Sequence, residues 1–249
     1  WVTVGTEGFS AGTAFSLDFK LDQNDVPHVA YSDGNAGGFL TVMKFDGTNW
    51  VNVGVPAFTP STADFISLEF DQANVPHVAF KDWSNSGAAS VMKYNGTSWV
   101  SVGSSGFSAG EVYNTTLAFS PSNEPYVMYR DVVNANEGTM MKFNGTNWVP
   151  VGSVGFTPQF SLSNDVVFHN GNPTVLCGHG SLSYATVMQF DGTNWNLVGP
   201  VNFSAGQTWN HAIDINSDNE LVVAFRDDGF GGKIIVRRFD GTNWVIVGS

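Results

Sequence analysis

The amino-acid sequence predicts an all-β fold made of five repeated four-stranded units. Three observations support this prediction: short segments alternate between apolar and polar residues, one six-residue phrase recurs, and tryptophan returns at a nearly fixed spacing. The phrase occurs first as FDGTNW at 45–50, and copies follow at 94–99, 143–148, 190–195 and 239–244. Trp1, Trp50, Trp99, Trp148, Trp195 and Trp244 are separated by 49, 49, 49, 47 and 49 residues. A period in this range indicates an array of structural repeats.

The recurring phrase predicts a β-hairpin in every unit. Asp-Gly or Asn-Gly between two apolar segments is the strongest local signal for a two-residue hairpin turn, in which both central residues have positive φ. We therefore expect a strand that ends at Phe45, a tight turn, and a further strand that begins at Trp50.

The first unit shows the expected elements in order. Residues 14–21 alternate apolar and polar with a period of two, as a half-buried strand does. The second, third and fourth strands are expected at 27–31, 40–45 and 50–53. In the later units, first strands are expected at 65–70, 115–119, 165–168 and 212–215, second strands at 76–80, 125–129, 173–177 and 221–225, and third strands at 90–94, 139–143, 186–190 and 235–239. No stretch has helical periodicity of useful length.

Four antiparallel strands repeated five times are the blade pattern of a β-propeller. We therefore predict a single five-bladed propeller with four antiparallel strands per blade and a repeat of about 49 residues. It spans residues 1–249, with units 1–49, 50–98, 99–147, 148–194 and 195–243 and a closing strand at 244–249. A parallel β-solenoid is the main alternative, but the hairpins make neighbouring strands antiparallel. Residues 1–4 are a second copy of the closing strand, so the sequence leaves open which end closes the ring and whether the chain belongs to a longer array.

The composition narrows the classes of function. Hydrophobic residues make up 42% of the chain, enough for a packed core, and the formal net charge of −12 argues against a nucleic-acid partner. No segment approaches the roughly 18 apolar residues of a membrane span. The single cysteine, Cys177, excludes an internal disulfide, and a buried apolar role is expected for it. Richness in Asn, Thr, Ser and Gly with little Lys favours a secreted or cell-surface protein. In a eukaryote that glycosylates its secreted proteins, Asn95, Asn114, Asn144 and Asn202 are glycosylation motifs.

The strings WxxVG, GFSAG and DGTNW, which return exactly or as variants along the five repeats, carry a resemblance to known families. The chain resembles the five-bladed propellers of the tachylectin type, and it is similar to repeat propellers of large secreted surface proteins. The resemblance covers the whole chain as a repeat plan and is specific for fold rather than for function. It implies N-acetylated sugars bound once per blade.

One face of the expected propeller varies between units and is the expected location of a site. It is formed by the connections between blades and by the loops after the second strands, whereas the opposite face repeats nearly unchanged. Acidic, aromatic and cationic side chains on the varied face suit the hydroxyls and the apolar face of a sugar. The candidate ligand-binding residues are Asp33, Asp64, Asp82, Trp83, Tyr113, Arg130, Asp131, His179, Trp209, Arg226 and Asp227.

The aspartates that end the second strands have a competing structural explanation. Asp33, Asp82, Asp131 and Asp227 occupy this position whatever their neighbours are, so a side chain that caps the following loop is favoured over a ligand-binding carboxylate. Calcium is a further, weaker possibility at 33–35 and 227–229, because no EF-hand spacing is present; no other cofactor is expected.

Three functions follow in order of preference. The first is a non-catalytic extracellular binding or adhesion module, most plausibly for glycans. The second is a structural repeat that contacts other surface proteins within a larger polypeptide or assembly. The third is a glycosidase or lyase, which would need two carboxylates in distinct roles, with Glu69 and Asp214, or Asp18 and Asp165, as the candidates. Cys177 with His179 forms a weak candidate for a thiolate pair, and His28 and His77 are expected to be hydrogen-bonded strand residues rather than metal ligands.

Overall fold

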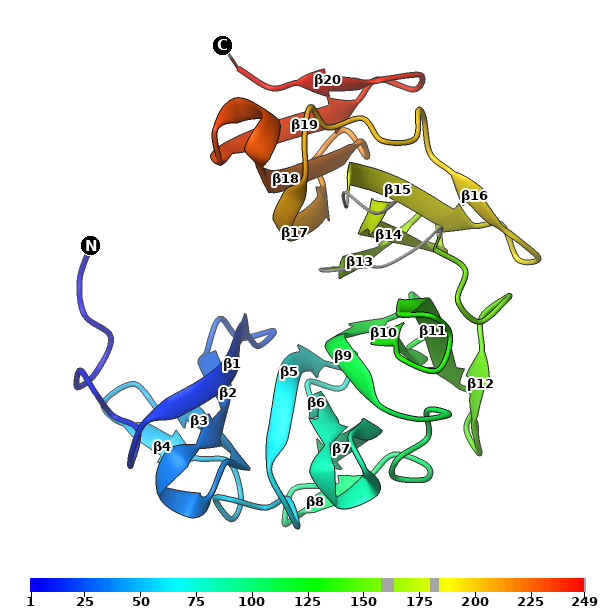
Figure 1. Cartoon of the computed structure of the whole chain (residues 1–249). Helices are drawn as coiled ribbons and strands as arrows, with labels where there is room; N and C mark the ends of the chain where they lie inside the picture. Colours follow the sequence, from blue (N-terminus) through cyan, green and yellow to red (C-terminus); the bar gives the residue numbers. More distant parts are fainter. Residues whose placement is uncertain (158–163, 180–183, 249) are drawn as a thin grey trace. The chain divides into compact units, whose positions relative to one another are not determined.

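The computed structural model describes residues 1–157, 164–179 and 184–248, with the side chain of His179 left out (Figure 1). They form five antiparallel four-stranded sheets, and in each sheet the strands are hydrogen-bonded in sequence order. This arrangement confirms the predicted all-β fold of five propeller blades. Among the described residues, none forms a helix that is long and apolar enough to cross a membrane.

The twenty strands within the described residues follow the predicted repeat. The first sheet contains β1 (Ala14–Leu21), β2 (Pro27–Asp33), β3 (Phe39–Phe45) and β4 (Trp50–Asn52). The second contains β5 (Ala63–Phe70), β6 (Pro76–Asp82), β7 (Ala88–Tyr94) and β8 (Trp99–Ser101). The third contains β9 (Val112–Phe119), β10 (Pro125–Asp131), β11 (Glu137–Phe143) and β12 (Trp148–Pro150). The fourth contains β13 (Asn164–His169), β14 (Asn172–His179), β15 (Tyr184–Phe190) and β16 (Trp195–Leu197). The fifth contains β17 (Thr208–Ile215), β18 (Leu221–Asp227), β19 (Lys233–Phe239) and β20 (Trp244–Ile246).

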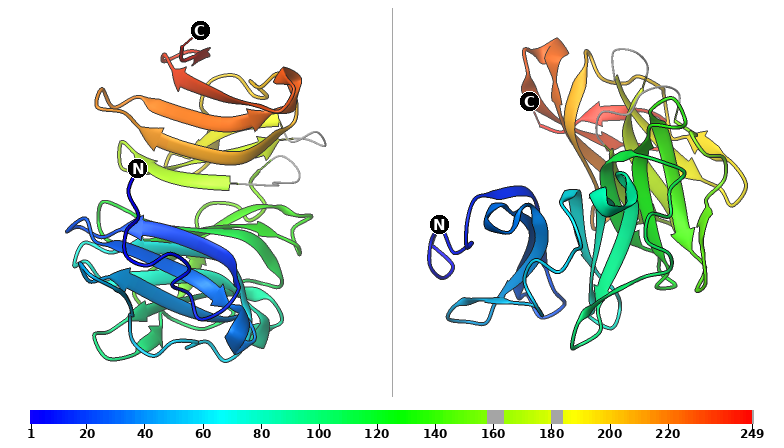
Figure 2. Two further views of the ribbon diagram at one scale, coloured as in Figure 1. Left: turned by 90° about the vertical axis from the view of Figure 1, so that its left-hand side faces the viewer. Right: turned by 60° about the horizontal axis from the view of Figure 1, so that its bottom comes forward.

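The chain divides into two compact units. The first comprises Trp1–Phe119 and Phe143–Trp148, and the second comprises Ser120–Lys142 and Val149–Ser249. Figure 2 shows the strands of the first sheet in blue and those of the fifth in orange and red, side by side within each sheet.

The first strands of the second to fifth sheets are longer than the sequence predicted, whereas that of the first sheet spans the predicted residues 14–21. A bulge interrupts the alternation of the first strand in the first, second and fifth sheets. In the first sheet the register with β2 shifts between Phe15 and Leu17, and Ser16 has a φ of 38°. The same shift occurs in the second and fifth sheets, with positive φ at Phe65 and Asn210. A bulge of this kind adds an unpaired residue and bends the strand, so the expected start at residue 65 falls two residues after the observed one.

Neighbouring sheets in the first unit pack through an apolar core. It includes Leu40 and Val42 of β3 together with Leu68 of β5 and Phe80 of β6, all at most 1% exposed. Burial of each such side chain contributes roughly 1.5–3 kcal/mol. A sheet of this size has two apolar faces, so each blade depends on its neighbour for stability.

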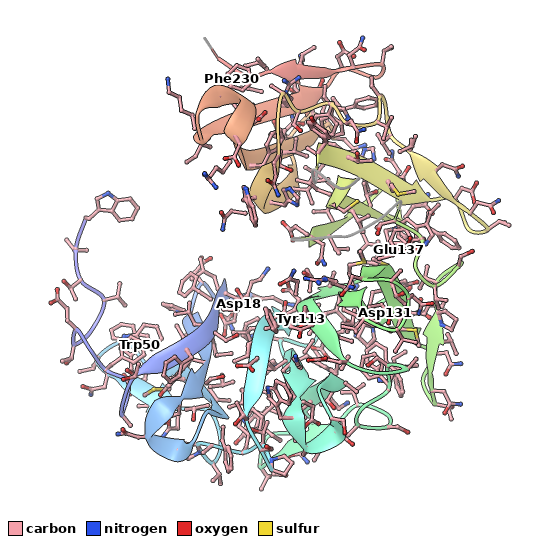
Figure 3. The ribbon with its side chains drawn as sticks, in the orientation of Figure 1. Asp18, Trp50, Tyr113, Asp131, Glu137 and Phe230 are labelled. Carbon is pink, nitrogen blue, oxygen red and sulfur yellow. The ribbon has the colours of Figure 1, made fainter. Side chains whose placement is uncertain are left out.

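Polar side chains on the first strands add hydrogen bonds between neighbouring sheets. Asp18 of β1 accepts a hydrogen bond from the Leu68 backbone N–H of β5 at 2.7 Å, and the two strands flank it in Figure 3. In the second unit, Asp165 of β13 accepts one from the Ile213 N–H of β17 at 3.0 Å. The first strand of a blade is the edge of its sheet, and these carboxylates satisfy backbone donors that the edge leaves unpaired.

The recurring tryptophan ties each connection to the blade that follows it. Trp99 donates its indole N–H to the Val53 carbonyl at 2.8 Å and stacks on Phe58 with ring centroids 4.4 Å apart. Gly54, with a φ of 77°, lies directly beneath this cluster, where a Cβ would approach the Tyr94 ring to 2.7 Å. The glycine of the WVxVG string is therefore required both by its backbone conformation and by the close approach of the aromatic rings.

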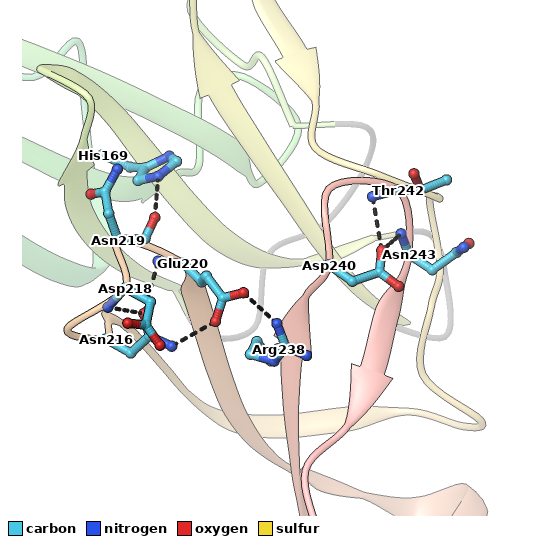
Figure 4. Close-up of polar contacts among 9 residues, drawn as sticks. All are labelled: His169, Asn216, Asp218, Asn219, Glu220, Arg238, Asp240, Thr242 and Asn243. Carbon is cyan, nitrogen blue, oxygen red and sulfur yellow. Dashed lines mark hydrogen bonds and ion pairs between the residues drawn. The ribbon is translucent and has the colours of Figure 1, made fainter.

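The predicted hairpins form, but the expected two-residue turn is wrong. Phe45 pairs with Trp50, so the loop has four residues, and Gly47 is the one among them with positive φ. Asp46 Oδ1 accepts the backbone N–H groups of Thr48 and Asn49 at 2.9 and 2.8 Å. This side-chain turn takes the place of the turn in which two consecutive residues have positive φ. Figure 4 shows the copy at Asp240, with donors from Thr242 and Asn243.

The turns between first and second strands lie on the same side of each sheet as these hairpins. In the fifth sheet, Asn216 accepts the backbone N–H groups of Asp218 and Glu220, and Glu220 in turn pairs with Arg238 of β19 (Figure 4). His169 of the fourth sheet contacts the carbonyl of Asn219 at 3.0 Å. Contacts such as that between His169 and Asn219 connect neighbouring blades at the face that repeats nearly unchanged, which we call the repetitive face.

Candidate functional site

In each sheet, the varied face is formed by the start of the first strand and by the loop after the second strand. Among the loops that the structure describes, three hold a 3₁₀ turn: η1 (Gly34–Ala36), η2 (Trp83–Asn85) and η3 (Asp228–Phe230). Backbone hydrogen bonds join each turn to the residue that precedes the first strand. Gly34 N–H donates to Thr13 at 2.8 Å, and Asp228 N–H donates to Gln207 at 2.9 Å. The residue at the start of the first strand therefore faces the turn across a short gap.

The four aspartates at the ends of second strands cap these loops, which confirms the structural explanation of their recurrence. Their carboxylates accept backbone N–H groups two residues further on, at 2.9–3.1 Å, and the residues are at most 5% exposed. The four are Asp33, Asp82, Asp131 and Asp227. Further donors fill the remaining acceptor positions, such as the Ser90 hydroxyl on Asp82 at 2.7 Å and the Ala205 N–H on Asp227 at 3.0 Å.

Three predicted site residues, two from the second sheet and Tyr113 from the third, come together around a lysine. The Trp83 indole N–H donates to Asp64 Oδ2 at 2.7 Å, while the Trp83 side chain stays 45% exposed. The Lys81 ammonium lies 4.3 Å from the centre of the Trp83 ring and 3.9 Å from that of Tyr113. The indole of Trp83 is therefore held by a hydrogen bond to a carboxylate and by a cation–π contact with Lys81, while much of its surface remains exposed to solvent.

The Lys81 ammonium is buried and neutralised. Its side chain is 2% exposed and forms an ion pair of 2.6 Å with Glu111, which also accepts a hydrogen bond from the Tyr113 hydroxyl at 3.0 Å. Lys81 and Tyr113 together hold the pKa of Glu111 below its usual value, because both bonds favour the ionised carboxylate. The lysine therefore stabilises the site and offers little charge to a ligand.

Phe65 completes this cluster at a cost in backbone strain. Its φ is 49°, a left-handed value that bulky residues rarely adopt, whereas Asn114 occupies the equivalent position in β9. The Phe65 ring packs edge-on against Tyr113 with centroids 5.3 Å apart and lies 5.9 Å from the Lys81 ammonium. Strain held by packing in this way is typical of functional sites.

The fifth sheet repeats the arrangement with two residues exchanged. Trp209 of β17 donates its indole N–H to Asp228 Oδ2 at 3.2 Å. Asp228 also forms an ion pair of 2.8 Å with Arg226, and both side chains are more than one third exposed. Of the predicted site residues, the structure therefore joins Trp209 and Arg226 through an aspartate that the sequence analysis considered only for calcium.

The first sheet contributes a cavity of about 250 Å³. Its lining includes Phe9, Tyr31 and Asn52 together with the cap Asp33. The cavity is mostly apolar with a few polar groups at its wall, a composition common in small-ligand sites. Asp33 is the one predicted site residue that lines it.

Among the remaining candidates, Arg130 has a local structural partner. Arg130 donates two hydrogen bonds to the Asn136 side chain, at 2.8 and 3.1 Å. The thiolate hypothesis is wrong for Cys177, because the thiol is fully buried and burial raises its pKa to about 12. His179 ends β14, and its side chain lies outside the described residues. His28 and His77 are buried, each with Nδ1 3.0 Å from a backbone carbonyl, as expected for hydrogen-bonded strand residues.

The acidic residues of the first strands are engaged within the fold. Glu69 forms an ion pair of 2.8 Å with Lys20, and Asp214 accepts the Ile215 N–H at 2.8 Å. Asp18 and Asp165 accept backbone donors of the neighbouring sheets, as described above. Among the residues that the structure describes, no group of three or more His, Cys, Asp or Glu side chains is placed to hold a metal ion, so the calcium hypothesis gains no support.

Sequence reasoning missed Lys81, Glu111 and the role of Asp228. A signal for Lys81 was available, because it occupies the same repeat position as Arg226, which was selected. A signal for Asp228 was available too, since Asp64 and Trp83 stand at the two repeat positions that hold Trp209 and Asp228 in reverse order. Glu111 lies in a variable connection and has no counterpart in the other repeats that would have drawn attention to it.

Comparison with known proteins defines the class at the level of fold. No family model and no curated protein matches the sequence. Among solved structures, the chain is similar to a mutant of AofleA from Arthrobotrys oligospora, with a TM-score of 0.65 and 11% identity over 98% of this chain and 76% of that one. It is similar to SapL1 lectin in complex with α-methyl fucoside, with a TM-score of 0.64 and 12% identity over 97% and 82% of the two chains. It is also similar to a PL25 polysaccharide lyase, an ulvan lyase, with a TM-score of 0.63 and 10% identity over 96% and 73%. At such low identity the similarity shows a shared blade architecture, and the same architecture serves both a lectin and a carbohydrate-processing enzyme.

Proposed function

We propose that this protein is an extracellular carbohydrate-binding module that acts as a lectin through the varied face. The observation that carries the proposal is Trp83, a large and partly exposed indole held rigidly between a carboxylate and a buried ammonium. Sugars present an apolar C–H face that packs on aromatic rings and hydroxyls that bond to carboxylates. Similarity in fold to a lectin and to a polysaccharide lyase supports a carbohydrate-related role.

We further propose binding without turnover. Glycoside hydrolysis requires two carboxyl groups about 5–10 Å apart with different pKa values. Here Glu69 is neutralised by Lys20, and Asp18 and Asp165 hold backbone N–H groups of adjacent sheets. These engagements favour a structural role for the first-strand acids over an acid and base pair.

A glycan array tests the proposal. We expect the fluorescently labelled protein to bind a subset of immobilised glycans and to be displaced by the corresponding free sugar at millimolar concentration. The Trp83→Ala variant should lose at least part of this signal, while Thr97→Ala, in the hairpin turn on the repetitive face, should retain it. Absence of binding to every glycan would refute the proposal. Release of new reducing ends or unsaturated products from a bound polysaccharide would refute the non-catalytic assignment.

A further inference from the structure

The second and fifth sheets carry the same three chemical groups on the varied face, with two of them exchanged. In both, an indole N–H donates to a carboxylate across the gap between the first strand and the 3₁₀ turn, at 2.7 and 3.2 Å. In both, the second-to-last residue of the second strand supplies a cation, which lies over the indole ring in the second sheet and pairs with the carboxylate in the fifth. The second sheet uses Asp64 on the strand, Trp83 on the turn and Lys81; the fifth uses Trp209 on the strand, Asp228 on the turn and Arg226.

The exchange shows that the pair, and not either residue alone, is retained. If the strand position required an aspartate for folding, a tryptophan could not replace it. The same two positions hold Phe15 and Gly34 in the first sheet and Tyr113 and Val132 in the third, yet those sheets form the same four strands. The blade therefore folds without an indole–carboxylate pair, and a role outside the folding of the sheet accounts for its recurrence in two blades.

The chemistry of the two sites favours an uncharged ligand. The indole supplies an apolar platform and the carboxylate an acceptor for hydroxyl groups, which suits a pyranose ring. Each cation already has a carboxylate partner within 2.8 Å, Glu111 for Lys81 and Asp228 for Arg226. The chain as a whole carries a formal net charge of −12, which repels anionic polysaccharides.

We infer that the protein has two equivalent subsites for neutral pyranose sugars, one on the second sheet and one on the fifth, and that the indole–carboxylate pair forms each of them. This inference rests on the proposed carbohydrate-binding function. Lys81 and Arg226 are positioning residues that fix the pair.

The indole N–H signals of the eight tryptophans, observed by two-dimensional NMR, test the inference on the full chain. The probes are methyl β-galactopyranoside, methyl α-fucopyranoside and N-acetylglucosamine as neutral sugars, and glucuronate as an acidic one. We expect at least one neutral probe to shift two indole signals, those that disappear in Trp83→Phe and in Trp209→Phe. Each single variant should lose one responsive signal and keep the other, and glucuronate should bind at least tenfold more weakly.

An exchange experiment separates the pair from its individual residues. The double variant Asp64→Trp with Trp83→Asp converts the second sheet to the order found in the fifth. We expect it to bind the neutral probe within about threefold of the parent, whereas Asp64→Trp alone and Trp83→Asp alone lose the second-sheet response. Thr97→Ala is the control, and thermal unfolding verifies that each variant is folded. If the double variant does not fold, Asp64→Asn, which retains an acceptor oxygen, takes its place with a binding loss of no more than about tenfold.

The outcomes separate the two proposals. If no probe and no arrayed glycan binds, both the carbohydrate function and this inference fall. If a glycan binds but the responding indoles persist in both phenylalanine variants, the function stands and the two-subsite inference is overturned. Equal or tighter binding of glucuronate overturns the assignment to neutral sugars.

Discussion

Substitution of Trp99 tests how the blades are held together. Its indole is 7% exposed, stacks on Phe58 at 4.4 Å and donates to the Val53 carbonyl at 2.8 Å. Trp99→Ala removes this packing and leaves a carbonyl without its donor, so we expect the free energy of unfolding to fall by about 3–5 kcal/mol. Trp99→Phe keeps an aromatic ring on Phe58 and loses the hydrogen bond, for an expected loss of about 1–2 kcal/mol.

Trp50 provides a matched control in the first sheet. It stacks on Phe9 at 4.2 Å and donates to Val4 at 3.0 Å, but it is only partly buried and its hydrogen bond is exposed to solvent. Because water can replace much of what is lost, Trp50→Ala should cost about half as much as Trp99→Ala. The two substitutions remove the same atoms, so the difference between them measures burial.

Urea denaturation followed by far-ultraviolet circular dichroism and by fluorescence gives the comparison. Coincident transitions by the two probes are required before free energies are extracted. An m-value of about 2–3 kcal/mol per molar urea converts the predicted loss for Trp99→Ala into a midpoint shift of roughly 1–2.5 M. If Trp99→Ala costs no more than Trp50→Ala, the hydrogen bond and burial of Trp99 do not hold neighbouring blades together, and the explanation of the 49-residue tryptophan period is refuted.

Three further predictions concern charged residues. The carboxyl pKa values in the Asp-Gly turns are lowered by backbone N–H donors, so these turns contribute stability above about pH 4 that is lost as the pH falls through the folded pKa. The residues are Asp46, Asp191 and Asp240. Their triple replacement by Asn should leave the fold intact, because Asn95 forms the same turn. The melting temperature of this variant should change less with pH between pH 4 and 2.5 than that of the parent protein. An unchanged acid profile would contradict the assignment. Lys81→Met should lower the free energy of unfolding by about 1–2 kcal/mol, less than the loss of a fully buried ion pair, because Glu111 is one third exposed. It should also raise the pKa of Glu111, as measured by carboxyl NMR titration. A pKa that does not move would show that the ion pair is not formed. Asp82→Ala should lower the free energy of unfolding by about 2–3 kcal/mol, because four donors lose their acceptor. Asp82→Asn should keep most of the cap and most of the glycan binding. Loss of binding with full stability in Asp82→Asn would show that this residue contacts the ligand.

The sequence by itself determined the blades. The period of the tryptophans, the apolar alternation and the Asp-Gly turns act over a few residues, and each is strong enough to specify a strand or a hairpin wherever it occurs. Locally determined features were therefore predicted at nearly the correct positions, as for the strand at residues 14–21. The errors lay at positions where contacts outside the local pattern set the backbone conformation. The bulge at Phe65 is stabilised by packing against Tyr113, and the turn at Asp46 uses a side-chain acceptor in place of two residues with positive φ.

Only the tertiary structure decided which side chains are available to a ligand. The aspartates selected from the sequence proved to be split between two roles, since Asp82 is buried as a cap whereas Asp64 holds an indole at the surface. Their side chains are chemically identical, and the distinction depends on which backbone N–H groups the loop conformation brings near. Likewise, the charge of Lys81 is neutralised by Glu111, which is 30 residues away in the sequence. A site on this fold is formed by contacts between loops that follow different strands. The repeat in the sequence predicts where those loops lie, but it does not determine which of their side chains come into contact.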